Sequence, residues 1–179
     1  MRRVRYSVAM SLDGYISGPK GEIDWIVIDP EMDFGALMGA FDTVLLGRRT
    51  WEMSRGHGSG GMPGMRAYVC SRTLGQDDIG DATLVRDPAT TIGELKQAPG
   101  KDIWLFGGGT LFRSVLDLGL VDAVEVAVIP VLLGGGVPLL PPGGSRVTLS
   151  LTRHRIYPTT GTVSLEYVPV AGNATRRKR

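Results

Sequence analysis

The chain contains few of the residues that build disulfides and metal sites. Its 179 residues include one cysteine, Cys70, and two histidines. A single cysteine excludes an internal disulfide framework, and two histidines give no clustered metal-ligand spacing. No apolar run approaches the roughly 18 residues that a membrane-spanning helix needs. The absences exclude disulfide-stapled, metal-clustered and membrane-spanning proteins, and Cys70 is expected to be a small buried residue at a strand end.

The formal charge of +2 does not describe the body of the chain. Four of the 20 basic residues lie in Arg176–Arg179, which leaves 16 basic against 18 acidic residues elsewhere, a net charge of −2. A basic body that would bind nucleic acid is therefore absent. Residues 171–179 are predicted to be a disordered basic tail. The start of the chain leads into a strand-like run rather than a signal peptide, so a cytoplasmic location is expected.

The most informative pattern lies between residues 102 and 116. An apolar run of strand length, 103–106, stops at three glycines, and apolar residues then recur with helical spacing at Leu111, Phe112, Val115 and Leu116. This pattern predicts a strand, a glycine turn and a helix. The turn (Gly107, Gly108, Gly109) allows a ligand to touch the main chain, and the following helix start, Thr110 and Leu111, suits a phosphate. The spacing matches neither of the two common phosphate-loop fingerprints, so a tight turn without a ligand is the alternative.

Two further strand ends carry hydrogen-bond donors. The run 42–47 ends at Gly47 and is followed by Arg48, Arg49 and Thr50, and the run 66–70 is followed by Ser71 and Arg72. Guanidinium groups match phosphate geometry. Ligands of open α/β sheets bind beyond the carboxyl ends of the strands, so the three strand ends predict one dinucleotide site. The arginines and Ser71 suit a separate 2′-phosphate, which favours NADP over NAD; a pair of surface arginines is the alternative.

A long loop and a helix follow the first strand, Val4–Met10. The loop runs from Ser11 to Trp25, and long loops inside compact domains are often functional. Residues 29–41 are predicted to form an amphipathic helix because apolar residues recur at its helical spacing, with acidic residues at its start. The candidate proton sources on this stretch are Asp33 first, then Glu31 and Asp13. The alternatives are helix caps or solvated charges for the first two, and a plain turn for Asp13.

The remaining patterns complete one domain. They are a glycine-rich loop with a solvated His57 at 54–64, a strand at 83–86, a capping box at 91–94 that opens a helix to Ala98, a long strand at 121–130, a glycine run at 134–136 that is either a wide turn or a ligand contact, and a closing hairpin of 146–157 with 162–170. The sequence predicts a single α/β domain over 1–170: a central, mixed, mostly parallel sheet flanked by helices, with a C-terminal antiparallel hairpin.

The motifs in this order resemble the dihydrofolate reductase superfamily. The resemblance rests on Ser-Leu-Asp-Gly at 11–14, Leu-Leu-Gly-Arg-Arg-Thr-Trp-Glu at 45–52, Phe-Gly-Gly-Gly-Thr-Leu-Phe at 106–112, Leu-Val-Asp at 120–122 and Ile-Pro-Val-Leu-Leu-Gly at 129–134. It is closest to the bacterial branch related to the riboflavin-biosynthesis reductase C-terminal domain. The resemblance implies NADPH bound at 47–50, 71–72 and 107–111, nicotinamide near Ala9 and Ile16, and a homodimer.

Two departures from this resemblance concern the substrate. The riboflavin-pathway reductases carry a glutamate before the glycine run, where this chain has Phe106, and dihydrofolate reductases carry a carboxylate where this chain has Pro30. We therefore expect an NADPH-dependent reductase of a small pterin- or pyrimidine-like heterocycle, with no nucleic-acid or membrane partner and with selectivity in residues 13–34. The alternatives are a non-catalytic NADP-binding or scaffold protein and a riboflavin-pathway pyrimidine reductase.

Overall fold

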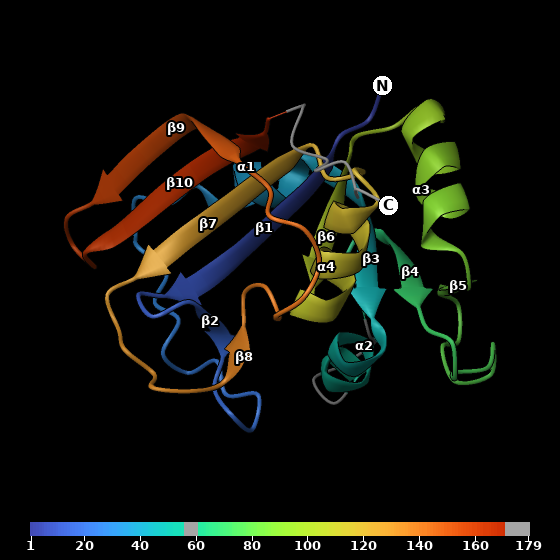
Figure 1. Cartoon of the computed structure of the whole chain (residues 1–179), viewed down its shortest axis with the longest axis horizontal. Coiled ribbons are helices and arrows are strands. Elements are labelled where there is room, and N and C mark those ends of the chain that lie inside the picture. The colour runs from blue at the N-terminus through green and yellow to red at the C-terminus, as the bar shows by residue number, and fades with distance from the viewer. Residues whose placement is uncertain (56–60, 171–179) are drawn as a thin grey trace, which may run out of the picture.

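The computed structural model describes residues 1–55 and 61–170 (Figure 1). The basic tail and His57 fall outside these residues. The elements along the chain are β1 (Val4–Ser11), β2 (Tyr15–Ser17), α1 (Phe34–Gly39), β3 (Phe41–Gly47), α2 (Arg48–Arg55), β4 (Arg66–Cys70), β5 (Thr83–Val85), α3 (Pro88–Gln97), β6 (Asp102–Gly107), α4 (Gly109–Asp117), β7 (Ala123–Ile129), β8 (Val137–Pro138), β9 (Leu149–Tyr157) and β10 (Thr162–Pro169).

The central sheet has eight strands in the order β5-β4-β3-β6-β1-β7-β10-β9. The six strands from β5 to β7 are parallel, and the hairpin β9–β10 joins β7 in antiparallel pairing. The strands β2 and β8 form a separate small sheet. The predicted fold is confirmed: a single α/β domain with a mostly parallel mixed sheet, flanking helices and a terminal hairpin.

Helices cover both faces of the parallel half of the sheet (Figure 1). One buried cluster joins apolar residues of α3 and α4 to β1, β6 and β7, among them Ile92, Phe112, Tyr6 and Val124. The other cluster packs Trp51 of α2 and residues of α1 against β3, β4 and β6. Because β3, β4 and β6 run parallel, their carboxyl ends, which carry the predicted ligand motifs, meet at one edge.

The first helix is shorter than the sequence predicted. The expected helix over 29–41 is wrong at both ends, because α1 spans Phe34–Gly39 and Phe41 begins β3. Asp33 is the N-cap, with its carboxylate accepting from the Ala36 N–H at 2.8 Å. Upstream, the carboxylate of Asp29 accepts from the Glu31 N–H at 2.9 Å and holds a turn. Local capping by the two aspartates therefore overrides the apolar periodicity.

The remaining predicted elements agree with the structure in type and differ in detail. The helix α3 begins at Pro88 with Asp87 as its N-cap, not at the capping box of 91–94, since proline suits the first helical position. The long strand predicted at 121–130 is present as β7, and it lies inside the sheet, paired with both β1 and β10. Within the glycine run at 134–136, a side chain on Gly136 would collide with the carbonyl of Ser17, whereas side chains on Gly134 and Gly135 would meet open space. Within 1–55 and 61–170, no helix is long and apolar enough to cross a membrane.

Candidate functional site

One large cleft of about 1600 Å³ runs from the carboxyl edge of the sheet onto the face of β1, β7 and β10. Its lining includes nearly all of the predicted cofactor residues: Ala9, Ile16, Gly47, Arg48, Arg49, Thr50, Ser71, Arg72, Gly107, Gly108, Thr110 and Leu111. The segment between β2 and α1 lies along the cleft and contributes Ile23, Val27 and Met32. The three strand ends predicted from the sequence therefore lie along a single cavity.

The glycine turn opens the cleft to the N-terminus of α4. Gly108 is the N-cap of α4, and within residues 1–55 and 61–170 no side chain caps the first amides of this helix. A β-carbon on Gly108 would lie 3.5 Å from Thr50 Oγ1, which is ordinary contact, whereas one on Gly109 would lie 2.6 Å from the carbonyl oxygen of Pro138. Gly109 is buried and does not line the cleft. The uncapped helix start suits an anion, and Gly109 is a packing residue.

The arginines beside the turn have different surroundings. Arg48 donates to Glu52 at 2.7 Å and to Thr73 at 3.1 Å. The hydrogen bond that Arg48 donates to Glu52 is the largest influence that raises the pKa of Arg48. Arg49 and Arg72 are exposed, line the cleft and form no ion pair with any described residue. The latter two guanidinium groups are therefore the ones available to a phosphate.

The loop after β4 is held in place by Arg86 and Ser71. Arg86 donates to the carbonyl oxygen of Ser71 at 2.6 Å and to that of Leu74 at 2.5 Å. The buried hydroxyl oxygen of Ser71 accepts from the backbone N–H groups of Thr73 and Leu74 at 3.2 and 3.0 Å. These bonds fix the backbone that carries Arg72. Burial raises the pKa of the neighbouring Cys70 thiol to about 12, so this residue is a neutral thiol at pH 7.

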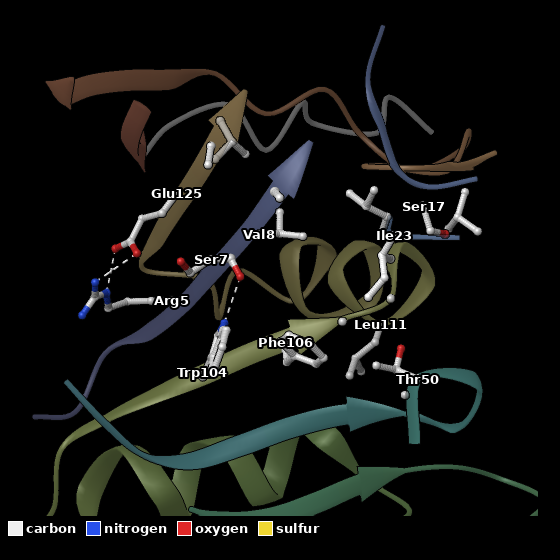
Figure 2. Close-up of a pocket in the computed structure, with 18 of the residues that line it drawn as sticks. Arg5, Ser7, Val8, Ser17, Ile23, Thr50, Trp104, Phe106, Leu111 and Glu125 are labelled. Carbon is white, nitrogen blue, oxygen red and sulfur yellow. Dashed lines mark hydrogen bonds and ion pairs between the residues drawn. The ribbon is translucent and has the colours of Figure 1, made fainter. Parts of the chain in front are cut away.

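At its other end, the cleft has a floor of strand side chains (Figure 2). Small residues on the two central strands, Ser7, Ala9 and Ala127, share this face and leave space above it. Trp104 and Phe106 of β6 form an adjoining aromatic wall, with ring centroids 4.9 Å apart. The indole N–H of Trp104 donates to the carbonyl oxygen of Ser7 at 2.9 Å and fixes the wall to the floor.

A partly buried ion pair lies on the same floor. Glu125 of β7 is 9% exposed and accepts two hydrogen bonds from Arg5 of β1, at 2.6 and 3.0 Å (Figure 2). Arg5 also lies 3.4 Å from Asp102 and 4.7 Å above the Phe41 ring. Burial lowers the pKa of the Arg5 guanidinium, but the hydrogen bonds and charges of Glu125 and Asp102 leave it raised above its ordinary value.

Of the three predicted proton sources, only Asp33 lines the cleft. Glu31 is exposed outside it and pairs with Arg155 at 3.1 Å. Asp13 accepts from the Ser11 hydroxyl at 2.7 Å and from the backbone N–H groups of Leu133 and Gly134 at 3.1 and 2.7 Å. The Ser11 bond is the first cause of a lowered pKa at Asp13. The geometry gives Asp13 a structural position, tying the turn after β7 to the loop after β1.

The floor residues carry no local sequence motif, and part of the predicted loop lies away from the cleft. Arg5, Ser7 and Glu125 were read only as members of strands, although a glutamate inside an otherwise apolar run was a visible signal. Of the aromatic residues in 13–34, the stretch expected to select the substrate, Tyr15 and Trp25 do not line the cleft, whereas Phe34 does. The apolar lining of the loop comes instead from Ile23 and its neighbours.

Comparisons with known proteins identify the group to which these features belong. Residues 2–163 match the family model of the RibD C-terminal domain. The chain is 33% identical over 183 residues to the uncharacterized protein YyaP of Bacillus subtilis, covering 93% of this chain and 94% of the relative. It is 32% identical over 147 residues to the uncharacterized protein YwjB of the same organism, covering 77% and 82%.

Solved structures agree with the family match. A putative riboflavin biosynthesis protein from Shewanella sp. PV-4 superposes with a TM-score of 0.77 at 27% identity, over 95% of this chain and 99% of that chain. RibD of Acinetobacter baumannii superposes with a TM-score of 0.70 at 18% identity, over 95% of this chain and 58% of that chain. At the latter identity, the likeness concerns the fold alone, and the chain spans just over half of that protein.

Proposed function

The chain belongs to the RibD C-terminal domain family, and on this premise we propose that it is an NADPH-dependent reductase that transfers a hydride to a small heterocyclic substrate. The observation that carries the proposal is the continuity of one cleft. At one end lie the start of α4 and the guanidinium groups of Arg49 and Arg72, which pair with no residue that the structure describes. At the other end lie an aromatic wall and a polar floor. Such a cleft has room for a dinucleotide and a ring placed against it.

The residues present fit the cofactor. The amides of Thr110 and Leu111 at the start of α4 would hold the pyrophosphate, and Arg49 and Arg72 the 2′-phosphate. Ala9 and Ile16 would flank the nicotinamide. The bound cofactor supplies the hydride, while the protein supplies orientation, a dry pocket and a proton. In this proposal Trp104 and Phe106 exclude water from the ring, and Asp33 is the proton source.

The riboflavin-pathway pyrimidine reductase is the competing substrate assignment. Its support is the family match and the solved relatives, which include a pyrimidine reductase-like protein from Corynebacterium diphtheriae. Against it stands Phe106, which lines the cleft where those enzymes carry a glutamate and which accepts no hydrogen bond from a polar substrate. A non-catalytic NADP-binding protein is the other alternative.

Two measurements test the proposal. Calorimetric titration with NADPH and NADH should show binding of NADPH. If neither nucleotide binds, both the reductase proposal and the non-catalytic nucleotide-binding alternative are wrong. Absorbance of NADPH should then fall with at least one member of a panel of dihydrofolate, other pterins, the riboflavin-pathway pyrimidine and simple quinones. Binding without turnover across the panel would favour the non-catalytic alternative. A cytoplasmic location stays a prediction.

We also propose that the protein is a homodimer that covers β9. This strand is an edge of the sheet, and eight of its nine residues are exposed, including Leu151 and Ile156. An exposed apolar edge strand is a surface that native proteins pair or cover. Sedimentation should give a mass near twice that of one chain, and a concentration-independent mass near 19.2 kDa would contradict the proposal.

A further inference from the structure

The floor of the cleft contains a hydroxyl group without a partner. Ser7 is 9% exposed and lines the cleft, and its hydroxyl makes no hydrogen bond to any residue in 1–55 or 61–170. Its backbone carbonyl is occupied by the Trp104 indole, so the position of the residue is fixed while its side chain stays unpaired. The Ser7 oxygen is not among the enclosed side-chain atoms without a partner, so it is open to the cleft. A hydroxyl held on the cleft floor with no protein partner among the described residues can donate to and accept from a ligand in the cleft.

The carboxylate of Glu125 is the direct neighbour of this hydroxyl. Ser7 and Glu125 are partners in the register of β1 and β7 and lie on the same face of the sheet (Figure 2). The two bonds from Arg5 fix the carboxylate but use only one acceptor site on each oxygen. Each oxygen keeps a further lone pair for a ligand donor.

Stability alone does not explain this charge. In the register of β7 and β10, Glu125 lies directly opposite Glu166 on the same face, and like charges at such positions are destabilising. Among the residues that the structure describes, the ion-pair partner of Glu166 is the exposed Arg153, at 3.7 Å. A buried ion pair is weak support for stability compared with packed apolar residues, so a carboxylate retained at this point fits a binding role better.

Resting on the proposed function, we propose that Ser7 and Glu125 are the specificity-determining residues that read the polar edge of the substrate ring. The ring edge has an N–H group that donates to Glu125 and a neighbouring polar atom that pairs with the Ser7 hydroxyl. Arg5 is a positioning residue, since it touches the ring only through Glu125. Trp104 and Phe106 provide the apolar surface beside this edge. Substrate recognition thus comes from side chains of β1 and β7. The Glu125 carboxylate takes the place of the carboxylates that this chain lacks at Phe106 and Pro30.

The test uses matched rings that differ only in their N–H groups. Uracil and 1,3-dimethyluracil, and a pterin with its N-methylated counterpart, are compared by saturation-transfer NMR on the full chain with and without NADPH. The unsubstituted rings should bind and the methylated rings should bind at least about tenfold more weakly, because a buried carboxylate is left unpaired. Absence of binding by every N–H ring would overturn the proposal.

The variants separate this inference from the proposed function. Ser7→Ala should weaken ring binding about three- to tenfold and Glu125→Gln about tenfold or more, while NADPH affinity stays within about twofold. Ser150→Ala, on β9 outside the cleft, is the control and should leave both unchanged. If both cleft variants bind NADPH normally and still discriminate the paired rings as the parent does, the inference is wrong and the reductase proposal stands. If the parent binds rings with this selectivity but no nucleotide, the reductase proposal fails and the ring site stands.

If Glu125→Gln fails to fold, Ser7→Ala alone tests the proposal, because removing the Ser7 hydroxyl oxygen breaks no hydrogen bond to a described residue. For any substrate found, the ratio of kcat/KM between the N–H ring and its methylated analogue gives a second readout. Ser7→Ala should reduce this ratio, and an unchanged ratio would overturn the assignment of Ser7.

Discussion

The two ends of the cleft are built in different ways. The end at the glycine turn uses backbone amides and exposed guanidinium groups from three strand-to-helix or strand-to-loop junctions, each contiguous in sequence. The floor uses buried side chains from strands far apart in sequence, with Arg5 and Glu125 separated by 120 residues. Backbone donors recognise a phosphate but do not distinguish one ring from another, whereas a fixed carboxylate beside a free hydroxyl does. This difference is the reason for proposing cofactor binding at the turn and substrate choice at the floor.

The largest effect on the proposed cofactor end is expected from changes at two adjacent glycines. Gly108→Val should abolish measurable NADPH binding, a loss of about a thousandfold or more, because the side chain blocks approach to the backbone. Gly108 has a φ of −88°, so a side chain is sterically allowed and the thermal midpoint should stay near that of the parent.

Gly109→Ala is the matched control for that change. Its methyl group would meet the Pro138 carbonyl and Pro141, so the free energy of unfolding should fall by about 1–3 kcal/mol through overpacking. Calorimetry with NADPH and thermal unfolding measure the two effects. If Gly108→Val binds NADPH like the parent, the turn is structural and the cofactor end is assigned wrongly.

The features that could be predicted from the sequence are those formed by residues close together along the chain. The glycine run and the arginines after Gly47 are local patterns whose strand-end positions were predicted, and the sheet and closing hairpin followed from apolar runs and alternation. The pairing of Ser7 with Glu125 depends on the register between β1 and β7, which no local pattern encodes. The short length of α1 was not predicted for a related reason. The carboxylate of Asp29, in the turn before α1, accepts a hydrogen bond from Thr160, which is 131 residues away.

A second prediction sharpens the assignment of the proton source. Asp33→Asn should lower kcat by about a hundredfold, within the range for loss of a general acid, with NADPH affinity nearly unchanged. Asparagine is as good an N-cap as aspartate, so α1 and the thermal midpoint should be preserved. The measurement is NADPH oxidation with whichever ring is turned over. If Asp33→Asn turns over at the parental rate, Asp33 is not the proton source, and ordered water or a carboxylate of the floor is the next proton source to test.

A third prediction concerns the choice between the two nucleotides. Arg72→Ala and Arg49→Ala should weaken NADPH by about ten- to hundredfold, equal to about 1.5–3 kcal/mol for a charged contact, and should leave NADH nearly unchanged. Arg48→Ala serves as the comparison, because that guanidinium is already paired with Glu52. Calorimetric titration with each nucleotide gives the ratio. Equal losses of affinity for NADPH and NADH would mean that these arginines contact the pyrophosphate, which both nucleotides share, or lie outside the site.

The smallest expected effect lies in the segment between β2 and α1, which borders both ends of the cleft. The Asp29 carboxylate ties this segment to the turn between β9 and β10 by accepting from the Thr160 N–H and hydroxyl, at 3.1 and 2.9 Å. The backbone bond from Glu31 is the first cause of a lowered pKa at Asp29, followed by the Thr160 bonds after the opposing effect of burial.

A lowered folded-state pKa fixes the sign of the pH dependence. The stability that Asp29 contributes is fully present above its unfolded-state pKa of about 4 and is lost as the pH falls through the lower folded-state value. Asp29→Asn should therefore reduce stability modestly at pH 7 and flatten the loss of stability below about pH 4. Thermal midpoints from pH 7 to pH 3 measure this, with Asp24→Asn, on the same segment and without such bonds, as the control. If the parent and Asp29→Asn lose stability in parallel over that range, the carboxylate does not anchor the segment, and its position beside the cleft must depend on apolar contacts such as those of Ile23 and Met32.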